Sequence, residues 1–256
     1  MSRILITGSS DGLGLEAGRQ LSADGHAVVL HARNEARAEA ARQSLPNCEA
    51  VVRADVSTLA GMHALAEQIT GLGTFDAVIH NVGVGYGGGH IVTPDGFERI
   101  FAVNVVAPFV LTATTPRPRR LIYLSSEMHV DGNPDLSDPM WETRRWNGVQ
   151  AYCDSKLYDT MLAIALAGRW SDVRVNAVDP GWIATKMGGA NAPGKLADGA
   201  RTQVWLAAGD APEATVTGGY FHDMRQSRAC AAVYDEDAQK RLVDYLERIT
   251  GISLPD

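Results

Sequence analysis

Residues 3–14 of the chain read RILITGSSDGLG, and this segment decides the fold. A short apolar run leads directly into a glycine-rich stretch with Gly8, Gly12 and Gly14, after which a helix-like pattern begins. Glycines allow a tight turn and let the backbone approach a phosphate group closely. The helix start adds free N–H groups and the positive end of the helix dipole. The segment predicts a strand, a phosphate-binding turn and a helix; a purely structural turn is the alternative.

Outward from this segment, short β-branched or apolar runs alternate with stretches of helical periodicity. The alternation predicts an α/β fold, a doubly wound parallel sheet of the Rossmann type with helices on both faces. No Pro/Gly/Ser-rich linker divides it, so we expect residues 1–256 to form a single domain. The expected strands are Arg3–Ile6, Ala27–Leu30, Glu49–Arg53, Ala77–His80, Arg120–Leu124, Arg174–Val178 and Gly219–Phe221. The expected helices are Gly14–Asp24, Glu35–Ser44, Leu59–Thr70, Asp95–Phe109, Ala151–Gly168, Gly194–Ala208 and Glu236–Thr250.

Two stretches, Glu127–Val149 and Lys186–Pro193, are rich in turn residues and lack both periodicities. Each follows the carboxyl end of an expected strand, where ligands bind in open α/β sheets. We therefore expect the walls of a substrate pocket to come from Glu127–Val149, Gly83–His90 and Trp182–Pro193. Plain solvated loops are the alternative.

The composition is that of an ordinary globular protein, with 45% hydrophobic and 21% charged residues. The formal net charge of −7 offers no electrostatic basis for binding nucleic acid or an anionic membrane surface. Three scattered cysteines and histidines without ligand spacing predict neither a disulfide framework nor a metal site. The N-terminus has no signal-peptide core, and the longest uncharged stretch, Ile100–Pro116, contains Asn104 and Pro108. We expect a cytoplasmic protein without a membrane span.

Tyr152 and Lys156 stand one helical turn apart at the start of an expected helix. Tyrosine is a weak acid–base group near neutral pH because its reference pKa is about 10. A lysine on the same helix face favours the phenolate through its positive charge. Ser126, at the end of the preceding strand, can donate a hydrogen bond to a substrate oxygen and stabilise its developing charge. These residues suit the proton transfer that accompanies reduction of a carbonyl group.

Taken together, the motifs resemble those of the short-chain dehydrogenase/reductase family over nearly the whole chain. In the family's order they are Gly8-x3-Gly12-x-Gly14, Ala54-Asp55-Val56, His80-Asn81-Val82-Gly83, Asn104, Ser125-Ser126, Tyr152-x3-Lys156 and Pro180-Gly181 with Thr185. The sequence around Tyr152 and the segment Gly219–Phe221 is most similar to the retinol-dehydrogenase-like carbonyl reductases. Two residues depart from the family pattern, since His80 and Val82 stand where the family has asparagine and alanine.

The resemblance implies an oxidoreductase that transfers a hydride between a nicotinamide cofactor and the carbonyl or alcohol carbon of a small organic substrate. It implies the catalytic residues Asn104, Ser126, Tyr152 and Lys156. For Asn104 the implied role is to hold a water that connects to the lysine, and a local hydrogen bond is the alternative. Ser125 is the alternative to Ser126.

The end of the second expected strand indicates which nicotinamide cofactor binds. An acidic residue there accepts hydrogen bonds from the ribose hydroxyls of NAD(H), but Ala32 holds the position and Arg33 follows. An arginine can pair with the 2′-phosphate of NADP(H). Asp11 argues the other way, because some NADP-using relatives have a basic residue there, and a merely solvated Arg33 is the alternative. We expect NADP(H) rather than NAD(H). The expected cofactor-binding residues are Gly8, Ser10, Asp11, Gly12, Leu13, Gly14, Arg33, Asp55, Val56, Asn81, Val82, Gly83, Tyr152, Lys156, Pro180, Gly181, Ile183 and Thr185.

The spacing from Asn104 to Ser126 is 22 positions, which is shorter than the usual family spacing by about one and a half helical turns. Three prolines further limit the helix after Asn104. In many relatives that helix packs against its twin, so a homodimer through the usual interface is in doubt. The alternative function is a cofactor-binding regulator without turnover, although such relatives typically lose the tyrosine or the lysine. A sugar epimerase or dehydratase is a less suitable interpretation, because such an enzyme would need a longer C-terminal substrate domain.

Overall fold

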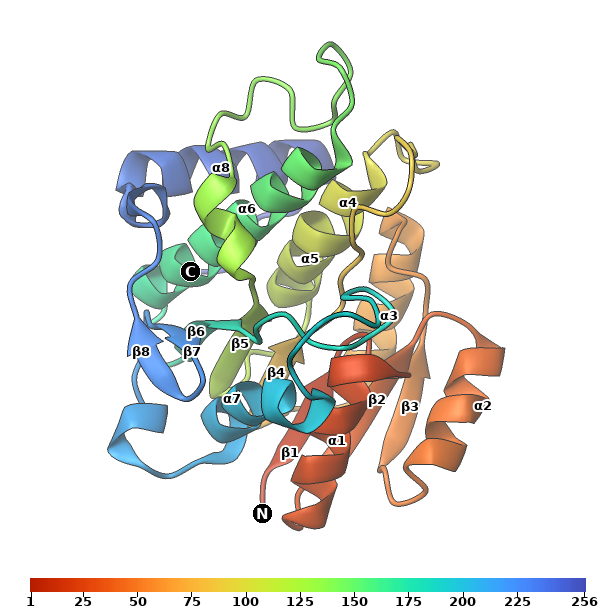
Figure 1. Cartoon of the computed structure of the whole chain (residues 1–256). Helices are drawn as coiled ribbons and strands as arrows, with labels where there is room; N and C mark the ends of the chain where they lie inside the picture. The colour runs from red at the N-terminus through yellow and green to blue at the C-terminus, as the bar shows by residue number, and fades with distance from the viewer.

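The computed structural model describes residues 1–256 and shows one eight-stranded sheet between two layers of helices (Figure 1). The strand order is β3-β2-β1-β4-β5-β6-β7-β8. All neighbours pair in parallel except β7 and β8, which form an antiparallel hairpin at one edge. The strands are β1 (Arg3–Ile6), β2 (Ala27–Ala32), β3 (Ala50–Arg53), β4 (Ala77–His80), β5 (Arg120–Leu124), β6 (Arg174–Asp179), β7 (Tyr220–His222) and β8 (Arg225–Ser227).

The chain runs outward from β1 to β3 and then returns to β4 on the other side of β1, so β1 and β4 flank the switch point of the doubly wound sheet. Residues of β1 alternate between the two faces. Ile4 and Ile6 join the apolar layer beneath one set of helices, while Leu5 joins the layer beneath the other. Burial on both faces explains why the strands are continuous apolar runs in the sequence.

The helices divide between these two layers. One layer contains α1 (Gly12–Ala23), α2 (Glu35–Ser44) and α7 (Leu196–Ala208). The other contains α3 (Leu59–Leu72), α5 (Ala107–Thr114), α6 (Gly148–Arg169) and α8 (Glu236–Thr250). None of the helices is both long and apolar enough to cross a membrane.

All seven expected strands are present, but the expected helix Asp95–Phe109 is wrong. The helical segment begins only at α4 (Arg99–Phe101), continues as a π-helix, η1 (Ala102–Val106), and passes into α5. Glu98 sets the start, because its carboxylate accepts a hydrogen bond from the Phe101 N–H at 2.9 Å. The Asp95 carboxylate is engaged elsewhere and accepts from the Leu59 N–H at 2.9 Å.

Helix α6 and strand β8 also differ from the expectation, while the other elements shift by at most two residues at an end. Helix α6 begins three residues early, because the Asn147 side chain accepts hydrogen bonds from the N–H groups of Val149 and Gln150. Strand β8 was not expected, since its sequence contains no apolar residue. The turn before it has positive φ at Asp223 and Met224, the geometry of a two-residue hairpin, without the usual Asn-Gly signal.

Candidate active site

A cavity of about 720 Å³ lies at the carboxyl ends of the strands, across the switch point. The loops that follow β1, β2, β3, β4 and β6, the end of β5 and the first turns of α6 all contribute to its wall. Among the residues expected to bind the cofactor, only Gly181 and Ile183 lie outside this wall. Ile183 is buried against Gly194 and Gly199, and Gly181 faces the ring of His222.

The glycine turn has the shape that a pyrophosphate requires. A Cβ atom at Gly14 would lie 2.4 Å from the Asn81 side-chain nitrogen, and one at Gly8 would lie 2.7 Å from the Val82 Cα atom. Gly12 has φ +57°, a conformation that side chains disfavour. The side chain of Asp11 does not cap α1, so the N–H groups of the first helical turn have no side-chain partner. The turn therefore fits a dinucleotide phosphate.

Two residues outside the expected cofactor-binding set, His31 and Thr7, hold this turn in place. His31 is buried, its Nδ1 accepts a hydrogen bond from the Gly8 N–H at 3.0 Å, and its Nε2 lies 2.9 Å from the Ala54 carbonyl oxygen. Burial lowers the pKa of His31, so the ring is neutral. The Thr7 hydroxyl accepts from the N–H groups of Asn81 and Val82 at 3.0 and 3.1 Å.

Cationic side chains gather at the outer end of the cavity, beside the end of β2. Arg33 lines the wall there, as expected, together with Arg37 and Lys186. Arg37 Nη1 and Lys186 Nζ lie 2.9 and 2.7 Å from the same oxygen of Asp11. Burial raises the pKa of Asp11, but these two hydrogen bonds bring it below its ordinary value. Arg37 lies in the first turn of α2, and no local sequence signal connects it with Asp11.

The inner end of the cavity contains Tyr152 and Lys156, which are only 8% and 5% exposed. The Lys156 ammonium donates hydrogen bonds to the Leu124 carbonyl and to the Asp159 carboxylate, the latter at 3.1 Å. Burial raises the pKa of Tyr152, while the Lys156 charge and hydrogen bonding to the Ser126 hydroxyl act to lower it. The thioether of Met187 lies 4.0 Å from the Tyr152 hydroxyl.

The structure distinguishes the two serines that follow β5. The Ser125 hydroxyl is buried and hydrogen-bonds the Thr160 hydroxyl at 2.5 Å, a contact between strand and helix. Ser126 is half-buried, caps the short helix η2 (Glu127–Asp131) through the Met128 N–H, and lies on the Tyr152 side. Ser126 is therefore the serine whose hydroxyl lies next to Tyr152, whereas Ser125 and not Ser126 lines the cavity wall.

Asn104 lies behind the wall, in the π-helix η1. Its side-chain oxygen accepts from the Val84 N–H at 2.8 Å, and its amide nitrogen donates to the Val84 carbonyl and the Ser155 hydroxyl. A Cβ atom on Gly83 would lie 3.5 Å from the Asn104 oxygen and 4.0 Å from Lys156 Nζ. The side chain of Asn104 thus ties the β4 loop to α6 beside the lysine.

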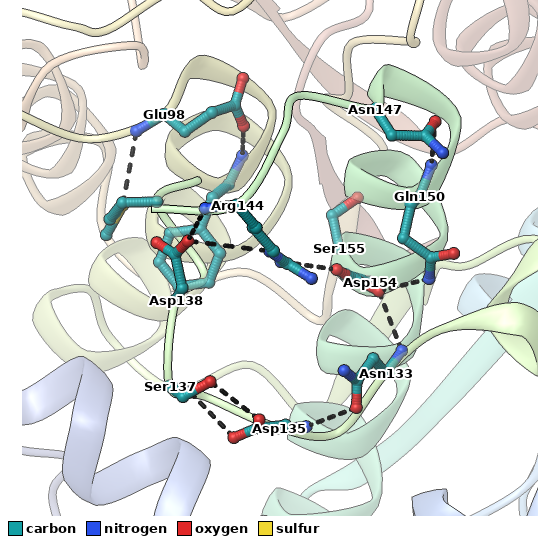
Figure 2. A network of polar contacts seen from close by, with 12 residues as sticks. Glu98, Asn133, Asp135, Ser137, Asp138, Arg144, Asn147, Gln150, Asp154 and Ser155 are labelled. Atoms are coloured by element: carbon teal, nitrogen blue, oxygen red, sulfur yellow. Dashed lines mark hydrogen bonds and ion pairs between the residues drawn. The ribbon is translucent and has the colours of Figure 1, made fainter. Parts of the chain in front are cut away.

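The loop between β5 and α6 is anchored by Asp154, as Figure 2 shows. The buried carboxylate accepts hydrogen bonds from the Asn133 N–H, the Gln150 side chain and the Arg144 guanidinium at 2.8 to 3.0 Å. The same guanidinium stacks 3.7 Å from the centre of the Trp141 ring, which packs with Tyr152. The stretch Glu127–Val149 is therefore tied to α6 by hydrogen bonds, but none of its residues lines the cavity, in contrast to the expectation that it forms part of the pocket wall.

Comparisons with known proteins identify the family of the chain. The family model described as short chain dehydrogenase matches residues 2–118. The short-chain dehydrogenase chry4 of Gibberella zeae is 42% identical over 260 residues, which cover 100% of this chain and 99% of that protein. The chain belongs to the short-chain dehydrogenase/reductase family. Human retinol dehydrogenase 13 is 29% identical over 98% of this chain and 85% of its own length, in agreement with the motif resemblance.

Solved structures show the same fold. A protein from Mycobacterium paratuberculosis superposes with a TM-score of 0.86 at 26% identity, over 100% of this chain and 96% of that one. A blue fluorescent protein from a metagenomic library, solved in complex with NADPH, gives a TM-score of 0.67 at 26% identity over 86% and 95% of the two chains. As a member of this family the protein is an oxidoreductase that acts on a small-molecule substrate with a nicotinamide cofactor. No group of three or more His, Cys, Asp or Glu side chains is placed to hold a metal ion.

Proposed function

We propose that the protein is an NADP(H)-dependent oxidoreductase that interconverts a carbonyl group and an alcohol of a small organic molecule. The observation that carries the proposal is the buried pair Tyr152 and Lys156 on one face of α6, with Ser126 beside it. Arg33 and Arg37 at the other end of the same cavity support the choice of cofactor.

Each residue has one task in this reaction. The nicotinamide cofactor, when bound, supplies or accepts the hydride at the reacting carbon. The Tyr152 hydroxyl donates the proton to the substrate oxygen during reduction and takes it back during oxidation. Burial raises the pKa of Tyr152, so the protonated form that reduction needs prevails at neutral pH. The Ser126 hydroxyl donates a hydrogen bond to the substrate oxygen. Lys156 stabilises the phenolate that remains after proton donation.

The preference for NADP(H) is supported by charge. The residue after β2 is Arg33, and no acidic side chain stands at the end of that strand. Asp11, the one nearby carboxylate in the glycine turn, is paired with Arg37 and Lys186. A 2′-phosphate would meet a net positive surface here. The complex of the blue fluorescent protein with NADPH adds support from a structural relative.

The test is the Tyr152→Phe variant, which keeps the ring and removes the proton donor. Oxidation of NADPH by a panel of ketones and aldehydes should slow by about a hundredfold or more. The affinity for NADPH, measured by fluorescence titration, should change little. Tyr245→Phe is the matched control, because Tyr245 lies on α8 outside the cavity wall and also loses only a hydroxyl; it should keep the rate.

Two outcomes would contradict the proposal. Retention of more than about a tenth of the rate by Tyr152→Phe would remove this tyrosine from the reaction. Binding of NADPH by the wild-type protein without turnover of any compound in the panel would instead favour a regulator that only binds the cofactor.

A further inference from the structure

Asp159 is a buried carboxylate that the proposed reaction does not use. It lies on α6, three residues after Lys156, and is 2% exposed. Its Oδ2 atom accepts a hydrogen bond from Lys156 Nζ at 3.1 Å, while its Oδ1 atom has no hydrogen-bond partner. A buried, half-satisfied carboxylate costs stability, so folding alone does not account for it. Its one partner is the lysine of the proposed proton-transfer pair, which points to a role in that pair.

The surroundings leave this ion pair electrically isolated. Lys156 is the only charged side chain that contacts Asp159. From β5, the Tyr123 hydroxyl faces the pair but is hydrogen-bonded to Thr112 at 2.7 Å. Behind it on β4, the His80 ring packs at a tilt against Tyr123, and burial lowers the pKa of His80 to about 3, so the ring is neutral.

Two negative charges act on Tyr152 against the charge of Lys156. One is Asp159, on the same helix, and the other is Asp179, at the end of β6. Asp179 has its own partners, because its side chain accepts from the Gly181 N–H at 2.9 Å and contacts His222 at 3.2 Å. Asp159 is therefore the carboxylate that pairs with Lys156, and its negative charge offsets part of the lysine charge that acts on Tyr152.

We propose that Asp159 is a positioning residue for the proton-transfer pair: it holds the Lys156 ammonium in place, keeps it protonated in its buried site and offsets part of its charge toward Tyr152. The inference rests on the proposed function of Tyr152 and Lys156. It assigns no contact between Asp159 and the substrate or the cofactor.

The ionisation behaviour of the pair supports this role. Burial lowers the pKa of Lys156, but the Asp159 charge and hydrogen bond bring it above its ordinary value. Burial also raises the pKa of Asp159 to about 6, although the lysine charge opposes the rise. Above about pH 6 the two groups therefore form an ion pair, and the field of the lysine at Tyr152 is partly cancelled.

Asp159→Asn, which keeps the shape and removes the charge, tests the proposal through the pH–rate profile of alcohol oxidation. Tyr152 would then experience the full lysine charge, so the ascending limb should move to lower pH by about one unit. Lys156, buried without its partner, should lose its proton at alkaline pH and produce a descending limb that the wild type lacks. Asp244→Asn is the matched control, because Asp244 also pairs with a lysine on its own helix, Lys240 on α8, and does not line the cavity; both limbs should stay in place.

A second measurement does not depend on turnover. The ultraviolet absorbance of the Tyr152 phenolate can be titrated without cofactor, as the difference between each protein and its Tyr152→Phe counterpart. In the Asp159→Asn background the phenolate should form at lower pH than in the wild type. An unshifted phenolate titration, or a pH–rate profile that is only scaled down, would overturn the role of Asp159.

The failure of this inference and that of the proposed function are distinguishable. Loss of activity in Tyr152→Phe with unmoved limbs in Asp159→Asn would reject Asp159 alone, whereas an active Tyr152→Phe would reject the proposed function. If Asp159→Asn does not fold, the Lys156→Met background provides the test. There the carboxylate is buried without a partner, so adding Asp159→Asn should raise the unfolding temperature. A lower unfolding temperature would overturn the pairing.

Discussion

Arg33 and Arg37 lie at the same rim of the cavity, but only one of them is already paired with a carboxylate. Arg37 is paired with Asp11, whereas Arg33 forms no ion pair. Arginine pairs with phosphate through charge-assisted hydrogen bonds, and Asp11 competes for Arg37 as an anion. A bound 2′-phosphate would therefore gain most from the unpaired Arg33, with Arg37 as a second contact.

We predict that Arg33→Ala weakens binding of NADPH by about tenfold or more and leaves binding of NADH nearly unchanged. Arg37→Ala should have the same selectivity with a smaller effect. Arg53→Ala is the control, because Arg53 is an exposed arginine that pairs with Glu35 and does not line the cavity. Fluorescence titration with both cofactors measures the effect. Equal losses for NADPH and NADH would mean that neither arginine binds the 2′-phosphate.

Among individual residues, those in the sequence motifs could be predicted, but not all of the residues that hydrogen-bond to them. Tyr152 and Lys156 were predictable because four positions on a helix bring two side chains together wherever the helix lies. His31 and Asp159 were not predicted as parts of the site. The role of His31 depends on contacts between separate loops, with Gly8 and Ala54. That of Asp159 depends on burial, which decides whether an i, i+3 pair on a helix is a surface contact or an isolated ion pair.

At the scale of elements, the predictable parts are those whose signals are local. Helix α2 occupies its expected range because Asn34, directly before it, caps the first turn through the Arg37 N–H. The helix predicted to begin at Asp95 does not begin there, because the Asp95 carboxylate accepts a hydrogen bond from the N–H group of Leu59, 36 residues earlier in the chain. The π-helix η1 that contains Asn104 likewise leaves no mark in the hydrophobic periodicity.

The loop between β5 and α6 leads to a prediction about substrate binding, because it packs through Trp146 against His90. Asp154→Ala removes the carboxylate that joins Asn133, Gln150 and Arg144, so this loop should loosen. Because this network does not include the proposed proton donor, KM should rise severalfold while kcat changes little. Asp135→Ala is the control, since the Asp135 side chain is in the same loop but bonds only Ser137. A fall in kcat at unchanged KM would contradict the idea that the network acts on substrate binding.

At the scale of the whole molecule, exposed apolar side chains are concentrated on one side. Apart from Met1, every large hydrophobic residue with high exposure follows β4, β5 or β6 at the carboxyl edge of the sheet. These residues are Tyr86, Ile91, Val92, Val130, Val149, Trp182 and Met187. Met187 is the one among them that lines the cavity, and a concentration of exposed apolar side chains is typical of a binding surface. The three segments that contain them include the loops expected from the sequence to surround the substrate.

The last prediction concerns the kind of carbonyl compound that the protein accepts. Burial of one additional methylene group contributes about 0.8 kcal/mol, which corresponds to roughly a fourfold gain in kcat/KM while the chain still contacts the apolar surface. In a series of ketones with lengthening apolar chains, kcat/KM should therefore rise stepwise and then level off. A carboxylate at the end of the same chain should cancel the gain, because a charged group would be desolvated against apolar side chains. In Met187→Ala the increments should be smaller, since Met187 lies next to the Tyr152 hydroxyl and exposes half of its surface. A kcat/KM that stays constant or falls along the series would show that these exposed side chains do not bind the substrate.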